Sequence, residues 1–345
     1  MKEYPDFFND EVGLEEALSR PTPELRELMK QLDGDLMFLG VAGKMGVSMA
    51  RMAKRACEEV GVNKRIIGVS RFSDPNQKKF LDDSGIETIK GDLLDRNFLD
   101  SLPDVKNVYY LAGMKFGTSG NQAFTWAMNA FLPGLIAEKY QKSNIVAFST
   151  GCVYPLIPIK QRGSKEIDAV GPIGEYAQSC LARERLFEYG SIKYGTAVTL
   201  IRLNYSVEMR YGVLIDIASQ VYNEAAIDLS MGFANVIWQG DANDMILRSI
   251  QHCESPAKPL NVSGSEVLSV REIATQFGEI MNKKVTFKGH EAPTALLTDS
   301  SIAYELLGRP KVSLNQVIRW SAKWIESKQR LLGKPTHFQE REGKY

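Results

Sequence analysis

The sequence predicts an α/β fold, in which a doubly wound parallel sheet carries a smaller α+β part woven into its C-terminal half. Between residues 35 and 205, short apolar runs typical of buried strands alternate with stretches of helical periodicity. This alternation indicates a parallel sheet covered by helices on both faces. A glycine-rich turn also separates the first predicted strand, residues 36–39, from the first predicted helix, residues 45–60. The chain has 345 residues, enough for one large or two medium domains.

The composition excludes several classes of protein. Lys plus Arg and Asp plus Glu number 42 each, so the zero net charge gives no electrostatic footprint for nucleic acid or an anionic membrane. No apolar run approaches the length of a membrane span, and residues 1–6 lack the apolar segment of a signal peptide. The cysteines are scattered and far from histidine, which indicates neither a metal site nor a disulfide framework: Cys57, Cys152, Cys180 and Cys253. We expect a cytoplasmic protein without a metal.

Residues 1–34 precede the first strand and form an N-terminal helical extension in our prediction. A helix is expected over residues 23–32, because Thr22 can cap it and Pro23 suits the first helical position. We expect the extension to pack on the main domain or on a second subunit.

The glycine turn predicts a dinucleotide site. Gly40, Gly43 and Gly46 follow a strand and open a helix. Residues without a Cβ let the backbone approach a pyrophosphate, whose charge then lies at the helix N-terminus. This placement is typical of a Rossmann-type domain.

The end of the second predicted strand, residues 65–72, bears on the choice of cofactor. In dinucleotide-binding units an acidic residue here binds the adenosine ribose, whereas an arginine accommodates a 2′-phosphate. This chain reads Ser70-Arg71, and the first acidic residue is Asp74. The sequence therefore favours NADP over NAD, although Arg71 is also readable as a solvated surface cation.

Four further strands are expected over residues 86–90, 107–112, 144–150 and 196–205, with a helix over residues 123–141 between the second and third of them. Ligands of such sheets bind beyond the carboxyl ends of the strands. The residues at five predicted strand ends are Gly40, Ser70, Asp92, Ala112 and Thr150. We expect them to surround one site.

Several motifs in this region resemble those of one enzyme family. They are the Gly-x-x-Gly-x-x-Gly of residues 40–46, Gly91-Asp92-Leu93, Leu-Ala-Gly-Met-Lys of residues 111–115, Phe-Ser-Thr-Gly-Cys-Val-Tyr-Pro of residues 148–155, Pro-Ile-Gly-Glu-Tyr of residues 172–176, Arg-Leu-Asn of residues 202–204 and Trp-Gln-Gly-Asp-Ala of residues 238–242. Over roughly residues 35–265 the chain resembles the extended short-chain dehydrogenases/reductases, the NAD(P)-dependent epimerase/dehydratase family. The loop at residues 111–115 is similar to that of UDP-galactose 4-epimerase, in which a lysine approaches the cofactor.

The resemblance implies the roles of individual residues. Thr150 would be the catalytic hydroxyl, Tyr176 the catalytic acid/base, and Asp92 and Leu93 adenine contacts. The implied cofactor-binding set is Gly40, Gly43, Lys44, Met45, Gly46, Ser70, Arg71, Asp92, Leu93, Leu111, Ala112, Gly113, Lys115, Asn129 and Ser149. The expected substrate-binding residues are Cys152, Asn204 and Arg210. Arg210, like Arg248 and Arg309, is an arginine able to bind an anion through two hydrogen bonds, and equally readable as a salt-bridged surface residue.

The sequence departs from the family at the catalytic helix. The family pattern is Tyr-x-x-x-Lys, but Cys180 stands four residues after Tyr176, on the same helix face. A neutral thiol supplies no cation to lower the phenol pKa, which is ordinarily about 10. Three hypotheses remain open: Arg183 or Lys115 substitutes for the lysine, Tyr176 acts as a neutral donor, or redox turnover has been lost. For Cys180 itself we expect a packed, inert thiol in place of a reactive one.

The C-terminal part is predicted to interleave two domains. The Rossmann domain takes residues 35–205 and about 235–264, the substrate domain residues 206–234 and 265–330, and a polar tail residues 331–345. Expected elements are helices over residues 213–224 and 242–253, an extended segment at 235–241, strands at 260–263 and 284–288, and a helix to residue 281 that opens with the capping box of Ser269 and Glu272.

The sequence thus predicts an NAD(P)-dependent epimerase, dehydratase or reductase. It would act by hydride transfer on a sugar or sugar-like substrate, nucleotide-linked or free. The alternative is a dinucleotide-binding sensor or scaffold without redox turnover, because of Cys180. The resemblance also implies a homodimer formed through the helices that carry Asn129 and Tyr176.

Overall fold

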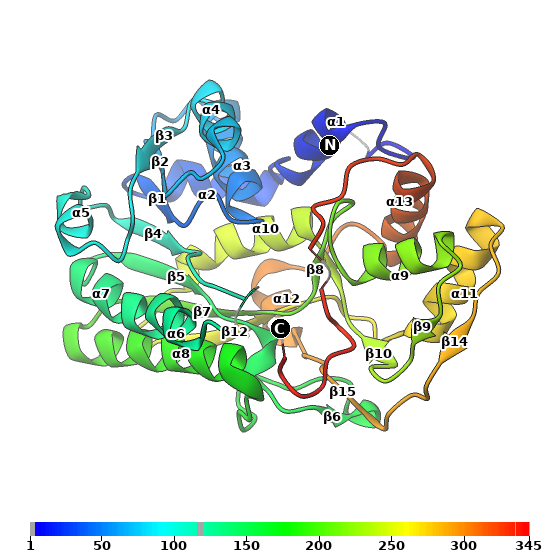
Figure 1. Cartoon of the computed structure of the whole chain (residues 1–345). Coiled ribbons are helices and arrows are strands. Elements are labelled where there is room, and N and C mark those ends of the chain that lie inside the picture. The colour runs from blue at the N-terminus through cyan, green and yellow to red at the C-terminus, as the bar shows by residue number, and fades with distance from the viewer. Residues whose placement is uncertain (1–3, 116, 118–119, 335, 345) are drawn as a thin grey trace.

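The computed structural model describes residues 4–115, 117, 120–334 and 336–344, and its centre is a seven-stranded sheet (Figure 1). Neighbouring strands of this sheet are parallel, in the order β12-β7-β5-β4-β1-β2-β3. The strands are β1 (Leu36–Leu39), β2 (Ile66–Ser70), β3 (Glu87–Lys90), β4 (Asn107–Tyr110), β5 (Asn144–Phe148), β7 (Val198–Leu203) and β12 (Lys258–Val262). The predicted α/β fold with a doubly wound parallel sheet is confirmed.

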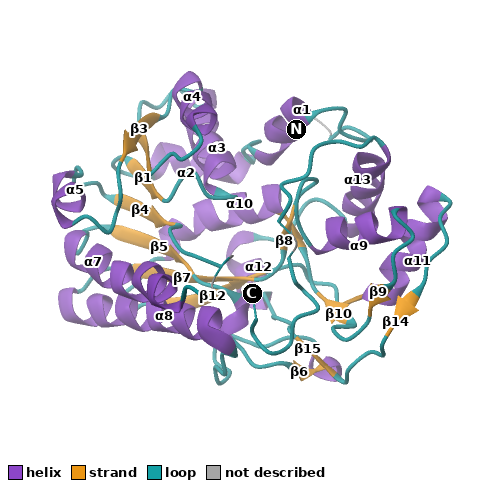
Figure 2. Cartoon of the chain, viewed as in Figure 1, coloured by secondary structure: helices purple, strands orange, loops and turns teal. Residues whose placement is uncertain are grey.

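Both faces of the sheet are covered by helices (Figure 2). In β1, Leu36 and Phe38 belong to the core on one face and Met37 and Leu39 to the core on the other, as the period of two in a strand requires. The first face packs against α2 (Pro23–Gln31), α3 (Gly46–Glu59), α4 (Pro75–Asp83), α10 (Gln239–Arg248) and α12 (Ser301–Leu307). The second packs against α5 (Arg96–Ser101), α7 (Leu132–Lys139) and α8 (Gly174–Tyr194).

The order of the strands reverses at β1, which lies between β2 and β4. Leu39 is in register with Val69 of β2 and with Tyr110 of β4, so these three strands end at the same edge. The loops that follow them diverge there and leave a crevice, the usual ligand position in such sheets.

Residues 206–234 and 265–330, which we call the C-terminal lobe, contribute most of a separate hydrophobic core. Its main helices are α9 (Val213–Tyr222), α11 (Val270–Met281) and α13 (Leu314–Glu326). Four pairs of two-residue strands lie in and around the lobe. Two pairs are internal to it: β9 (Ile227–Asp228) with β14 (Phe287–Lys288), and β10 (Phe233–Ala234) with β13 (Leu268–Ser269). Two pairs join it to the rest of the chain: β6 (Ile157–Pro158) with β15 (Thr294–Ala295), and β8 (Ser206–Val207) with β11 (Ile237–Trp238). One helix of the lobe, α12, packs under the main sheet instead of in this core.

The N-terminal extension packs on its own chain and bridges the two cores. Leu14 and Leu18 of α1 (Glu11–Leu18) are buried in the core of the C-terminal lobe, whereas Leu25 of α2 is buried under the sheet. Thr22 caps α2 by accepting a hydrogen bond from Leu25 N, and its hydroxyl donates to Asp244 of α10 at 2.6 Å. The capping prediction for this helix therefore holds.

Three expected elements differ in detail. The helix over residues 123–141 is divided into α6 (Gln122–Trp126), a π turn (Ala127–Phe131) and α7. The segment predicted to be extended to residue 241 is already helical from residue 239, because α10 follows β11 directly and no capping side chain marks its first turn. The strand expected at residues 284–288 shortens to the two residues of β14.

Candidate active site

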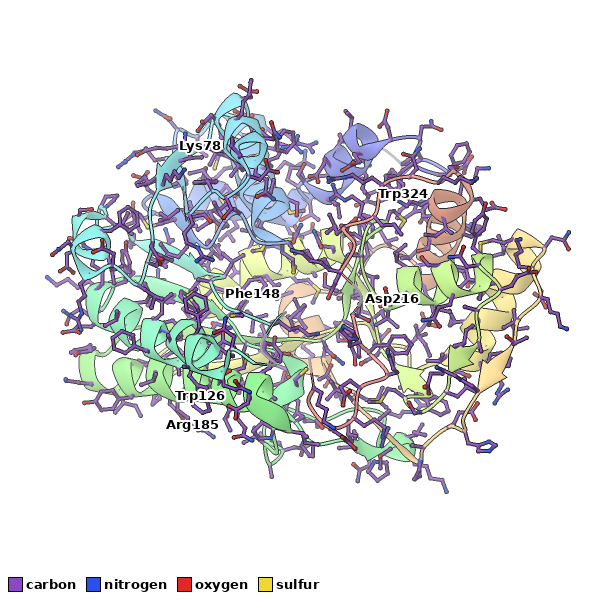
Figure 3. The ribbon with its side chains drawn as sticks, in the orientation of Figure 1. Lys78, Trp126, Phe148, Arg185, Asp216 and Trp324 are labelled. Carbon is purple, nitrogen blue, oxygen red and sulfur yellow. The ribbon has the colours of Figure 1, made fainter. Side chains whose placement is uncertain are left out.

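A cavity of about 250 Å³ opens at the carboxyl ends of the central strands, between the sheet and the C-terminal lobe. Figure 3 labels Phe148, which lines it from the end of β5, and Asp216, which belongs to α9 of the lobe. The lining residues are Gly43, Lys44, Met45, Gly46, Leu111, Gly113, Met114, Lys115, Phe148, Ser149, Thr150, Cys152, Tyr176, Arg183, Leu203, Asn204, Tyr205, Ser206, Tyr211, Gly212, Val213 and Thr336. Most of the sequence-predicted site residues meet here.

The glycine turn forms one wall. Gly40 has a φ of +90°, and a Cβ on it would lie 2.7 Å from Ala112 N. Only glycine therefore lets the turn after β1 pass this close to the chain that follows β4. Gly43, Met45 and Gly46 then line the cavity at the point where α3 begins. The unpaired N–H groups and the dipole of a helix N-terminus favour an anion at such a place.

Four predicted cofactor contacts lie outside this cavity, on the side of β2 and β3. Ser70 ends β2 and Arg71 follows with an exposed side chain. Asp92 Oδ1 accepts a hydrogen bond from Leu94 N at 3.0 Å, and Leu93 is buried in the sheet core. The positions surround the mouth of the crevice beyond the glycine turn, where their roles remain predictions.

The loop after β4 is fixed by Asn129, which lies in the π turn. The Asn129 amide accepts a hydrogen bond from Met114 N and donates one to Met114 O, both at 2.8 Å, and donates another to Ser179 Oγ. This holds Leu111, Gly113 and Lys115 along the cavity wall. Asn129 is fully buried and is not among the lining residues, so the structure gives it a positioning role in place of the predicted cofactor contact.

Arg183 reaches the cavity from α8, seven residues after Tyr176. Its Nη1 donates to Phe148 O at 2.8 Å and its Nη2 to Asn129 Oδ1 at 2.6 Å. A Cβ on Gly113 would lie 2.4 Å from Nη2, so the loop after β4 needs glycine there to admit the guanidinium. Arg183 Nε is buried without a hydrogen-bond partner. A cation therefore stands near the place where the family pattern would put its lysine.

Tyr176 lines the same cavity, and a hydrogen bond joins its side chain to that of Thr150. Burial raises the pKa of Tyr176 well above its usual value near 10, and the Cys180 and Cys152 thiols raise it further. Arg183 and Thr150 oppose the shift without outweighing burial. Of the three sequence hypotheses, this environment favours Tyr176 as a neutral hydrogen-bond donor.

Cys180 lies behind Tyr176, away from the solvent. It is fully buried against Val153 and Tyr154, and burial raises the pKa of its thiol to about 11. The thiol is therefore protonated at neutral pH and packs as a small apolar group, in agreement with the expectation of an inert cysteine.

Ser149 lines the cavity but uses its hydroxyl elsewhere. The Ser149 hydroxyl donates to Glu184 Oε1, and Glu184 also binds Arg202 through two hydrogen bonds of 2.7 and 3.0 Å. Both charged side chains are almost fully buried. Glu184 is missed by the sequence reading, although its position eight residues after Tyr176 on α8 puts it near the same helix face.

On the substrate side, Cys152 and Asn204 line the cavity as expected, and Asn204 Nδ2 donates to Asn235 Oδ1 at 2.9 Å. Arg210 requires a correction. Its guanidinium forms ion pairs with Glu11 and Glu15 of α1 and with Glu208, outside the lining of the cavity. Three carboxylates therefore assign Arg210 to the attachment of the N-terminal extension, not to the substrate.

Lys44 lies at the boundary between the glycine turn and the C-terminal lobe. Its Nζ donates to Ser206 O at 2.9 Å and lies 3.8 Å from the centre of the Tyr211 ring. Burial lowers the pKa of Lys44 to about 7, against the opposing charge of Glu208. Sequence reading missed the other lobe residues of the cavity, because residues 205–213 and 336 carry no motif: Tyr205, Ser206, Tyr211, Gly212, Val213 and Thr336.

Residues 37–207 match the family model described as NAD dependent epimerase/dehydratase family. This segment of the chain belongs to that family. Its glycine turn, the loop after β4, Thr150 and Tyr176 all fall within the match. No curated protein sequence matches the chain.

Solved structures of similar fold include enzymes that act on nucleotide sugars. A UDP-glucuronic acid 4-epimerase mutant from Bacillus cereus is 16% identical, with a TM-score of 0.72 over 85% of this chain and 99% of that one. A UDP-glucose 4-epimerase from Thermotoga maritima is 16% identical, with a TM-score of 0.69 over 85% and 99%. A dTDP-glucose 4,6-dehydratase from Bacillus anthracis is 15% identical, with a TM-score of 0.71 over 85% and 96%. At this identity the likeness establishes the fold.

Two features are absent from the residues that the structure describes. Among them, no group of three or more His, Cys, Asp or Glu side chains is placed to hold a metal ion. No helix in the same residues has the length and apolarity needed to cross a membrane.

Proposed function

We propose that this protein is an NAD(P)-dependent epimerase, dehydratase or reductase that transfers hydride to or from a sugar or sugar-like substrate. The observation that carries the proposal is the meeting of Tyr176, Thr150 and the glycine turn around one cavity at the switch point of the sheet. The family of residues 37–207 and the nucleotide-sugar enzymes of similar fold support the same reaction type.

The residues present fit a dinucleotide. Gly43, Met45 and Gly46 offer backbone and a helix N-terminus to the pyrophosphate, and Leu111 and Gly113 provide a flat wall beside it. Arg183, whose Nε is buried without a hydrogen-bond partner, lines the same cavity from α8 and would offer a cation to the bound group. Arg71 supports NADP by its charge, whereas the similar structures of the 4-epimerase mutant and of the dehydratase hold NAD. We propose NADP as the preferred form and test both.

The nicotinamide, when bound, supplies the hydride donor or acceptor. The protein holds the proton. Because Tyr176 is a neutral phenol, it is ready to donate its proton to a carbonyl oxygen as that carbonyl is reduced, with Thr150 orienting the phenol through their hydrogen bond. Oxidation of an alcohol requires Tyr176 to be deprotonated first, which the buried site opposes. The arrangement therefore supports reduction more directly than oxidation.

A second candidate function, a dinucleotide-binding sensor without turnover, is favoured by the raised pKa of Tyr176 and the neutral Cys180. The two candidates differ in one measurement. An enzyme shows cofactor turnover that falls by about 10²–10⁴ in Tyr176→Phe while cofactor affinity is retained. A sensor binds the cofactor equally well with and without this substitution and turns over nothing.

We further propose a homodimer and a cytoplasmic location. Trp126, Phe131, Tyr189 and Ile192 are exposed on α6, the π turn and α8, which pack side by side and would offer an apolar dimer face. The four cysteines of the chain are free thiols, which suits a reducing compartment. Light scattering tests the dimer, and a monomeric mass would contradict it.

The deciding experiment is calorimetric titration of the purified protein with NADP and NAD, together with mass spectrometry of any nucleotide that copurifies. Preferred, exchangeable NADP is the expected result. Tight copurified NAD would contradict the preference for NADP and indicate an internal redox cycle. Binding of neither nucleotide would refute the proposed function.

A further inference from the structure

The C-terminal segment, residues 336–344, runs back from α13 between the sheet and the C-terminal lobe (the red trace that ends at C in Figure 1). Its first residue, Thr336, is buried and lines the active-site cavity. Thr336 N and Oγ1 both donate to Asp216 Oδ2 of α9, at 2.8 and 2.6 Å. The sequence reading identified only a polar tail here, whereas the structure makes it part of the site.

Three further anchors hold this segment. The Phe338 ring is buried in the core of the C-terminal lobe. Arg341 donates to Thr294 O at 2.8 Å and to Thr294 Oγ1 at 2.6 Å. Gly343 meets Gly174, the first residue of α8, so closely that a Cβ on Gly174 would lie 2.4 Å from Gly343 O.

These contacts fill the cleft beyond Cys152. On that side of Cys152 a space of about 20 Å³ is left, which holds about one water molecule. Glu340, Arg341 and Gly343 line part of it. The active-site cavity itself measures about 250 Å³, below the roughly 300 Å³ at which sites for drug-sized ligands begin. A dinucleotide held by the glycine turn occupies part of this cavity, and beside Cys152 the segment leaves little space for a nucleotide attached to a sugar.

The charge of the cavity indicates what the small substrate carries. Lys44, Lys115 and Arg183 are the charged residues of the described lining, which holds no Asp or Glu. A reduced nicotinamide dinucleotide brings two pyrophosphate charges to this lining of three cationic side chains, so one cation is left to attract a second anion. Lys44 lies on the side of the C-terminal lobe, between Ser206 O and the Tyr211 ring.

We propose that the substrate is a free sugar acid or similar polyhydroxy acid, with its carboxylate bound by Lys44, and that residues 336–343 exclude nucleotide-linked sugars. This inference rests on the proposed function, since it assigns the substrate class of the same cavity. Glu208, Asp216, Lys115 and Arg210 are the charged groups whose fields act on Lys44. Burial lowers the pKa of Lys44 to about 7, so binding of a carboxylate there is accompanied by proton uptake near neutral pH.

The test uses the full chain saturated with the dinucleotide that it binds. Thermal shift and calorimetry are run with a panel of five- and six-carbon aldonates and uronates, with the matching neutral aldoses and alditols, and with UDP-glucuronic acid. We expect at least one acid to bind, its neutral analogue to bind at least tenfold more weakly, and UDP-glucuronic acid not to bind. Calorimetry of that acid in buffers of different ionisation enthalpy should show proton uptake at pH 8, and Lys44→Met should abolish this uptake and weaken the acid at least tenfold.

Two outcomes overturn the proposal. One is binding of UDP-glucuronic acid as tight as that of any free acid, and the other is binding of no acid by a protein that holds its dinucleotide. A chain ending at Lys334 and the milder Thr336→Val should each gain binding of UDP-glucuronic acid while cofactor affinity is kept. A shortened chain that keeps its cofactor affinity and still binds no UDP-glucuronic acid would also contradict the role of the segment. Failure to bind any dinucleotide instead refutes the proposed function, so the two failures are distinct.

Discussion

Restoring the family's lysine, by Cys180→Lys, is predicted to damage this protein instead of improving it. Cys180 is fully buried against Val153 and Tyr154 on the rear side of Tyr176. Lysine has three more side-chain heavy atoms than cysteine, and overpacking of this kind costs about 1–3 kcal/mol. The ammonium would also stand beside the Arg183 guanidinium, which already acts electrostatically on this position.

Burying the lysine charge adds the larger part of the free-energy cost. If burial drives the lysine pKa from about 10.4 to about 7, as it does for Lys44 in this protein, the cost is about 4–5 kcal/mol. We take about 5 kcal/mol as the total, because the packing can relax. An unfolding entropy of about 2.1 cal/mol/K per residue gives about 0.7 kcal/mol/K for the chain, so the melting temperature should fall by about 7 °C.

Differential scanning calorimetry with and without bound dinucleotide measures this effect, and cofactor turnover is followed in parallel. Cys180→Val, which changes the packing without adding a charge, is the matched control and should lower the melting temperature by less than about 2 °C. Our reasoning is refuted if Cys180→Lys melts within about 2 °C of the native protein and gains turnover. Arg183 would then not be the cation that serves this site.

Three further predictions concern groups around the site. Glu184→Ala leaves Arg202 buried without its partner, so chemical denaturation should show a loss of about 3–5 kcal/mol in the free energy of unfolding. Glu184→Gln should cost less. Equal stability of both variants and the native protein would contradict a stabilising buried ion pair. Burial raises the pKa of Asp241 to about 6, so the folded state binds a proton more tightly than the unfolded chain, and the free energy of unfolding should fall by about 2 kcal/mol as pH rises from about 4 to 6.5. Asp241→Asn should remove this slope, and a flat native profile would exclude it. Gly40→Ala places a Cβ 2.7 Å from Ala112 N at a φ of +90°, so calorimetry should show dinucleotide affinity at least tenfold weaker. An unchanged affinity would show that the turn can relax.

Local sequence signals predicted those parts of the site that depend on neighbouring residues in the chain. The strand, glycine turn and helix of residues 36–59 were readable because the apolar period, the missing Cβ atoms and the helix start are all local properties. Tyr176 and Arg183 were placed on one helix face from their spacing alone, and both line the cavity. The start of α10 was placed three residues late, because the helix follows β11 directly and no capping side chain marks its first turn.

The sequence by itself determined the parallel sheet, the position of the crevice and many of the residues that line it, because strand ends in a parallel sheet gather at one edge whatever the loops do. Only the tertiary structure decided the charge states and the shape of the site. The pKa values of Tyr176 and Lys44 depend on burial by segments far away in the chain. The return of residues 336–343 across the cleft is held by hydrogen bonds to Asp216 and Thr294, and contacts between residues so distant in sequence leave no local pattern to read.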